Sequence, residues 1–135
     1  MVATASKLRI GIMGAGAIGC FVGGRLASAG TADVILVGRS SLRDLVSEHG
    51  LTTRSFDRES HVASSRAPFT TDLAVLAECE VVLVCVKSGA TTEVAASLAA
   101  VLQPETIVVS LQNGVRNADI LQKHLRDNRV VDIAV

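Results

Sequence analysis

The sequence lacks a charge bias and lacks any long apolar stretch. Thirteen basic and thirteen acidic residues give a formal net charge of zero, and Lys and Arg never form a run longer than two. Nucleic acids and anionic membranes are therefore poor candidate partners, because both recruit clustered positive charge. Although 49% of the residues are hydrophobic, no run approaches the roughly 18 residues of a membrane-spanning helix, and Met1 to Ser6 is too short for a signal peptide. We expect a cytoplasmic protein.

Cysteine is scarce and has no pattern typical of a metal site. Cys20, Cys79 and Cys85 are odd in number, lack metal-ligand spacing and have no flanking pair of histidines. We therefore predict no metal and interpret the three as buried thiols in a reducing compartment. Cys20 falls in the first turn of a predicted helix, where a thiolate would be favoured, but packing is the preferred interpretation.

A glycine-rich turn between a strand and a helix is the most informative feature of the sequence. The β-rich run Leu8–Met13 leads into Gly14-Ala15-Gly16-Ala17-Ile18-Gly19, and apolar spacing predicts a helix from Ala17 to Ala29 that stops at Gly30. This order is typical of dinucleotide-binding folds: the first glycine permits the tight turn, the second admits a pyrophosphate, and the third allows close helix packing. The phosphates would lie at the helix N-terminus.

Further strands and helices alternate along the chain. The predicted strands are Asp33–Val37, Val81–Val86, Thr106–Ser110 and Val130–Val135, and residues 51–65 form a hairpin. The predicted helices begin at Ser40 or Ser41, at Thr71 or Asp72, at Thr91 or Thr92, and at Asn117, each of the first three capped by one of the two residues named. At 135 residues the chain suffices for one domain. We therefore predict a single α/β domain, a Rossmann-like doubly wound parallel sheet in the order 3-2-1-4-5-6.

The ligand crevice of such a sheet lies at the carboxyl ends of its strands. Four loops are expected there: 14–19, Gly38-Arg39, 85–89 and 112–114. Arg39 stands at the end of the second strand with no acid beside it, which favours a 2′-phosphate over a free ribose. A charge-assisted bond of about 1.5–3 kcal/mol predicts a roughly ten- to hundred-fold preference for NADPH over NADH. The alternative is a solvated surface arginine.

Lys87 and Asn113 are the other candidate side chains in the crevice. Lys87 follows an apolar strand, where its cation suits a phosphate or a ribose hydroxyl, although a strand-end lysine in water is the plain alternative. The amide of Asn113 can both donate and accept hydrogen bonds, and the alternative there is an ordinary Asn-Gly turn.

Four motifs together resemble the N-terminal domain of the ketopantoate reductase (2-dehydropantoate 2-reductase) family. They are residues 10–19, Val37-Gly38-Arg39, residues 84–88 and residues 109–115, and the similarity covers nearly the whole chain. The resemblance implies an NADP-binding domain over residues 1–135, with the phosphate loop at 14–19. It also implies that Arg39 binds the 2′-phosphate and Lys87 the cofactor, and that Asn113 lies near the nicotinamide and substrate.

By the same resemblance, the expected reaction is reduction of the small 2-ketoacid 2-dehydropantoate to pantoate with NADPH, a step toward pantothenate and coenzyme A. In the family a C-terminal helical domain supplies the proton-donor lysine and most substrate contacts. We expect that domain to be absent from these 135 residues, and an uncovered sixth strand would then favour a homodimer. Asp132 departs from the apolar pattern of a strand buried on both faces and suggests an exposed edge.

Two other functions stay open. One is a stand-alone NADPH-binding module without turnover, because cofactor residues are present and no general acid is positioned. The other is the cofactor domain of a different Rossmann dehydrogenase, of the opine or glycerol-3-phosphate type. A methyltransferase is less favoured, because it would usually need an acid after the second strand.

Overall fold

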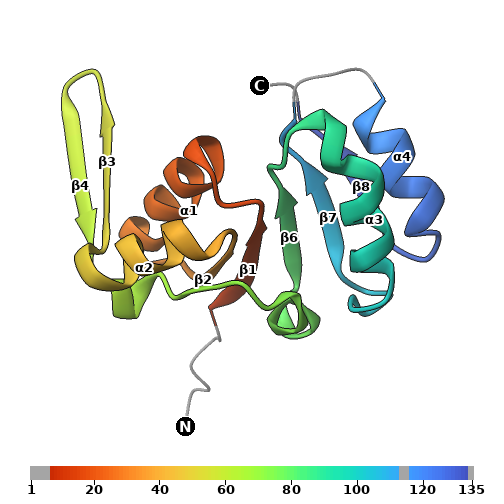
Figure 1. Ribbon diagram of the computed structural model, residues 1–135, viewed down its shortest axis with the longest axis horizontal. Helices are drawn as coiled ribbons and strands as arrows, with labels where there is room; N and C mark the ends of the chain where they lie inside the picture. The colour runs from red at the N-terminus through yellow and green to blue at the C-terminus, as the bar shows by residue number, and fades with distance from the viewer. Residues whose placement is uncertain (1–6, 113–115, 134–135) are drawn as a thin grey trace, which may run out of the picture.

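A computed structural model describes residues 7–112 and 116–133 and contains one parallel six-stranded sheet. The sheet order is β5-β2-β1-β6-β7-β8 (Figure 1). Numbered by their place among these six strands along the chain, the order is 3-2-1-4-5-6, and the predicted Rossmann-like architecture is confirmed. The strand bounds are β1 (Leu8–Met13), β2 (Ala32–Val37), β5 (Phe69–Thr70), β6 (Val81–Val84), β7 (Ile107–Ser110) and β8 (Val130–Asp132).

Helices connect these strands and cover the sheet. The α-helices are α1 (Ala17–Ala29), α2 (Ser40–His49), α3 (Thr91–Ala99) and α4 (Asn117–His124). Three short 3-10 helices are η1 (Ser64–Arg66), η2 (Leu73–Glu78) and η3 (Ser88–Ala90). Helix α1 has the predicted bounds and ends at Gly30, whose φ of 73° is left-handed, as expected for a helix stop. None of the helices in the described ranges combines the length and hydropathy that a membrane crossing needs.

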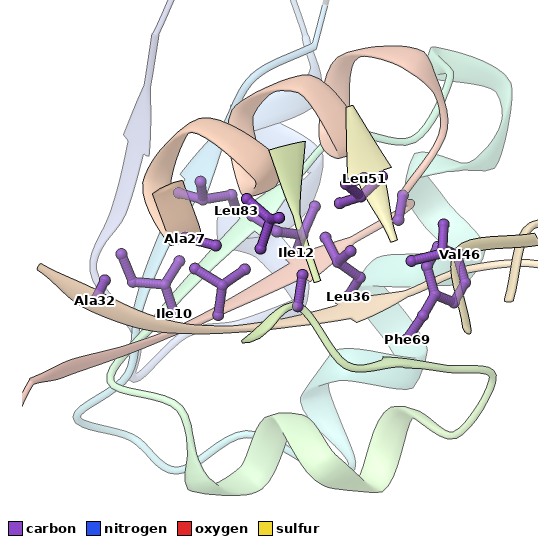
Figure 2. Close-up of a cluster of buried hydrophobic side chains, with 13 residues drawn as sticks. Ile10, Ile12, Ala27, Ala32, Leu36, Val46, Leu51, Phe69 and Leu83 are labelled. Carbon is purple, nitrogen blue, oxygen red and sulfur yellow. The ribbon is translucent and has the colours of Figure 1, made fainter. Parts of the chain in front are cut away.

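Successive residues of the strands enter two separate cores, as expected for a doubly wound sheet. Ile10 and Ile12 of β1 belong to a cluster that also contains Ala27 of α1, whereas Met13 belongs to a second cluster with Leu98 of α3 and Leu121 of α4. Figure 2 shows Ile10, Ile12 and Leu36 lying between the sheet and a helix. Because side chains alternate between the faces of a strand, both faces of β1 are buried.

The predicted hairpin is present and packs against α1. Its strands are β3 (Leu51–Ser55) and β4 (Arg58–Val62), which pair antiparallel and form a sheet of their own. A Cβ atom on Gly24 of α1 would lie 2.7 Å from Cγ2 of Thr53. The missing side chain at Gly24 therefore lets the hairpin lie directly on this helix, beside the main sheet in Figure 1.

Several local predictions need correction. The serines and threonines do not cap α2 and α3: the N-cap residues are Arg39 and Ala90, and neither helix has a side-chain cap. The buried Thr91 hydroxyl instead bonds Asn117. The helix after Asp72 is a 3-10 helix, and Asp72 does cap it by accepting from the Ala74 N–H.

Two strands of the sheet, β5 and β8, lack the long apolar run of the other strands. The third strand of the sheet, β5, has two residues, too few for a periodic signal, and the sequence patterns did not identify it. The sixth, β8, lies at the edge of the sheet, and among the described strands it pairs only with β7. Asp132 is exposed there, which agrees with the edge position that its charge suggests.

The packing of β2 against α1 predicts that two leucines differ greatly in their contribution to the free energy of unfolding. Leu36 is fully buried, whereas Leu45 of α2 is 55% exposed. Leu36→Ala is expected to lower the free energy of unfolding by about 2–5 kcal/mol, because it leaves a cavity in a packed core. Leu45→Ala, the matched control, is expected to change it by less than about 0.5 kcal/mol. Urea denaturation of both variants checks this, and equal losses would contradict the buried position of Leu36.

Candidate functional site

Strand register brings four loops to one edge of the sheet. Met13 lies opposite both Val37 and Val84, and Val84 lies opposite Ser110. The carboxyl ends of β1, β2, β6 and β7 are therefore level, and in Figure 1 the arrowheads of β6 and β7 point to this edge. The loops that follow these strands are the ones predicted to form the crevice, and parallel pairing brings them together.

Gly14 makes the turn that joins β1 to α1. Its φ is 90°, a conformation that favours glycine, and the N–H groups of Gly14 and Ala15 both donate to the carbonyl of Val37, at 3.0 and 2.9 Å. A Cβ atom at Gly14 would lie 2.8 Å from the backbone nitrogen of Val86. The turn therefore packs between the end of β2 and the segment that follows β6.

Gly16 and Gly19 differ in what surrounds them. A Cβ at Gly19 would lie 2.8 Å from the Gly14 oxygen and 2.9 Å from Cγ2 of Ile12, so close packing requires glycine there. A Cβ at the exposed Gly16, the N-cap of α1, would meet no atom of the described residues within 4 Å. The fold leaves open space at Gly16, as a bound phosphate would need at a helix N-terminus.

Arg39 lies beside the glycine turn. It is exposed at the N-cap of α2 and directly follows Gly38, where a Cβ would lie 3.4 Å from Cβ of Ala15. The first turn of α2 contains no acidic residue, and Arg39 forms no ion pair with any residue in the described ranges. This guanidinium is available to an anionic ligand.

Lys87 is exposed on the other side of the turn, in the loop after β6. It is the N-cap of η3, and its carbonyl accepts from the Ala90 N–H at 2.9 Å. With Arg39 it places two cations at the carboxyl edge, an arrangement that favours a polyanionic ligand. Asn113, the third predicted side chain, lies outside the described residues, together with Gly114 and Val115.

Beneath this edge the structure contains a buried polar network that the sequence analysis missed. Its members are the buried Thr91, Ser110, Gln112 and Asn117 and, at the end of the series, the exposed Ser88, joined by side-chain hydrogen bonds of 2.8–3.1 Å. Thr91 was predicted as a cap, and the role of Gln112 was not recognised. A pattern signal was available: Ser110 and Gln112 lie at the end of an otherwise apolar strand, where polar residues need partners when buried.

The two cysteines near the glycine turn are protonated at neutral pH. Burial raises the pKa of the Cys85 thiol to about 11, and the neighbouring Cys20 adds to this effect. Burial also raises the pKa of Cys20, whose thiol donates to the Ala15 carbonyl at 3.4 Å. A neutral thiol is a poor nucleophile, so packing accounts for both. Within the described ranges no three His, Cys, Asp or Glu residues gather as metal ligands would.

Comparison with known proteins identifies the family. Residues 10–135 match the family described as ketopantoate reductase PanE/ApbA. A 2-dehydropantoate 2-reductase of Halobacterium salinarum is 35% identical over 124 residues, covering 92% of this chain and 40% of that protein. The corresponding protein of Pyrococcus abyssi is 38% identical over 115 residues, 83% of this chain and 35% of that one.

A solved structure gives the same result for the fold. The crystal structure of a PanE/ApbA family ketopantoate reductase from Ralstonia eutropha JMP134 superposes with a TM-score of 0.83 at 32% identity, covering 93% of this chain and 40% of that one. The chain thus spans well under half the length of these relatives. Because the family match extends over nearly all of its residues, the chain belongs to the ketopantoate reductase family of oxidoreductases.

Proposed function

We propose that this chain is the NADPH-binding part of a 2-dehydropantoate 2-reductase. The observation that carries the proposal is the open space at Gly16, set between Gly14 and Gly19, where the fold itself requires glycine. The family supplies the reaction, reduction of the ketone of 2-dehydropantoate to give pantoate. Because the chain covers about 40% of its relatives, the activity of the whole protein is part of the proposal.

Each cofactor group has a proposed partner at the carboxyl edge. Within the loop 14–19, the N–H groups of Gly14, Ala15 and Gly16 donate to backbone carbonyls. The N–H groups of residues 17–19, in the first turn of α1, would therefore hold the pyrophosphate, where the helix dipole favours negative charge. Arg39, exposed and with no acidic residue in the first turn of α2, would bind the 2′-phosphate with its planar fork of donors. Lys87 would contact the cofactor from the loop after β6.

The nicotinamide, when bound, supplies the hydride that reduces the ketone. Asn113 is proposed to orient the nicotinamide and the substrate by hydrogen bonds. The family places the proton-donating lysine in a helical domain, and Lys87 is assigned here to the cofactor. The residues of this chain therefore bind and orient, and the proton is proposed to come from a second domain.

A second candidate is a stand-alone NADPH-binding module. It is favoured by the chemistry of the carboxyl edge, where both exposed cations, Arg39 and Lys87, are assigned to the cofactor and no side chain of the described residues is assigned as proton donor. This candidate shares the cofactor site with the first and differs in turnover, so an activity assay separates them.

Arg39→Ala is expected to remove most of the preference for NADPH. The wild-type chain should bind NADPH roughly ten- to hundred-fold more tightly than NADH, because charge-assisted bonds to the 2′-phosphate are strong. Arg43→Ala is the matched control on the same helix, since that guanidinium already pairs with Asp44 at 3.1 Å. Calorimetric titration with both cofactors measures this. Equal wild-type affinities would refute the assignment of Arg39.

Alanine at two neighbouring glycines should separate binding from folding. Gly16→Ala adds a methyl group to open space, so the free energy of unfolding should change by less than about 1 kcal/mol, while affinity for NADPH falls at least about tenfold. Gly19→Ala places a methyl group against Ile12 and the Gly14 carbonyl and should destabilise the fold by about 1–3 kcal/mol. Thermal unfolding and titration of both variants provide the test; unchanged binding by Gly16→Ala would contradict a pyrophosphate site.

A polypeptide of these 135 residues is expected to bind NADPH without reducing 2-dehydropantoate at an enzymatic rate. Loss of a positioned proton donor typically costs about 10²–10⁴-fold. The comparison is NADPH oxidation, followed by absorbance, for this chain alone and for the same chain extended by a helical domain of the family. Equal turnover by both would place the proton donor within residues 1–135.

A further inference from the structure

The buried polar network forms a one-way series of hydrogen bonds. The Ser110 hydroxyl donates to Oε1 of Gln112 at 3.1 Å, and Nε2 of Gln112 donates to Oγ1 of Thr91 at 2.8 Å. The Thr91 hydroxyl donates to Oδ1 of Asn117 at 2.9 Å, and Nδ2 of Asn117 donates to Oγ of Ser88 at 3.1 Å. Every donor in the series points toward Ser88, the neighbour of Lys87.

Four of the five side chains are buried deeply enough for their bonds to matter, and only Ser88, at the end of the series, is exposed. Thr91 and Ser110 have 0% of their surface exposed, Asn117 has 4% and Gln112 has 5%. A buried amide or hydroxyl that loses its partner also lacks water, so each bond in the series strongly favours one geometry. The network therefore holds its segments in place more firmly than exposed polar contacts would.

The segments that it joins all lie at the carboxyl edge. Ser110 ends β7, Thr91 and Asn117 open α3 and α4, and Ser88 begins η3 beside Lys87. Gln112 makes one further bond, in which Nε2 donates to the Val86 carbonyl at 2.9 Å. This bond positions the chain that lies against the Gly14 turn.

All of these segments except the Gly14 turn belong to one half of the fold. A doubly wound sheet of this type consists of two mononucleotide-binding halves, with the dinucleotide lying across the crevice between them. The half formed by β1, β2 and β5 carries the glycine loop and Arg39, which suit the adenosine nucleotide. The network lies in the half formed by β6, β7 and β8. This half would then bind the second nucleotide, the one that carries the nicotinamide.

We propose that Thr91 and Gln112 are positioning residues for the nicotinamide half of the cofactor. Thr91 is central, because its hydroxyl accepts from Gln112 and donates to Asn117. Through these bonds it orients the segment that contains Lys87 relative to the end of β7. This inference rests on the proposed cofactor site and extends it to two side chains that need not touch the ligand.

The test compares Thr91→Val, which removes the hydroxyl at nearly constant volume, with Thr91→Ser, which keeps the hydroxyl. Titration calorimetry would measure the Kd for NADPH and for adenosine 2′,5′-bisphosphate, which carries only the adenosine half. Thr91→Val should weaken NADPH binding by about tenfold and leave binding of the bisphosphate within about twofold, a split that general unfolding would not produce. Thr91→Ser should retain most of the wild-type affinity for both ligands.

Amide hydrogen exchange without ligand gives a second readout. Exchange in residues 86–91 should accelerate in Thr91→Val and not in Thr91→Ser, while β1 stays as protected as in the wild type. Parallel weakening of both ligands, or unchanged NADPH binding and exchange in Thr91→Val, would overturn the inference. If the wild-type chain binds neither ligand, the proposed cofactor site is wrong, whereas the exchange data still decide whether the network orders this loop.

Discussion

Helix α1 lies so close to β1 and β2 that side chains at two of its positions would overlap the strands. A Cβ at Gly19 would approach Ile12 to 2.9 Å, and one at Gly23 would approach Leu36 to 2.6 Å. This contact sets the angle at which α1 leaves the sheet, and with it the direction of the helix N-terminus at Gly16. The glycine turn, the hairpin packed on α1 and the open space at Gly16 all depend on this close approach.

The two sides of the carboxyl edge of the sheet are built in different ways. On the side of β1 and β2, backbone groups dominate: the Gly14 and Ala15 N–H groups share the Val37 carbonyl, and glycines allow the contact. On the side of β6 and β7, buried side chains hold the loops, with Gln112 and Thr91 at the centre. Backbone hydrogen bonds resist most substitutions, whereas the side-chain network depends on each residue that takes part in it.

Local patterns predicted two kinds of element: helices whose apolar spacing extends over several turns, and strands that lie in long apolar runs. Helix α1 has the predicted bounds, because periodic spacing and a glycine stop act within one segment. Capping was predicted less well. Thr91 has the residue type of a cap, yet its hydroxyl bonds Asn117, 26 positions away, because burial next to another polar side chain outweighs a local preference.

The sequence by itself determined the fold class, the glycine turn and the residue types that are proposed to bind a phosphate, because these follow from chain geometry within a few positions. Arg39 could be recognised as a candidate from its place after a strand. Tertiary structure alone decided that Gly16 faces open space while Gly19 is packed, and that Gln112 and Thr91 form a hydrogen bond at the carboxyl edge. The reason is physical. The space around Gly16 and Gly19 depends on how α1 packs on β1, which the pattern of residue types does not give. Gln112 and Thr91 are 21 positions apart, and only the parallel register of β6 and β7 brings the ends of these strands level.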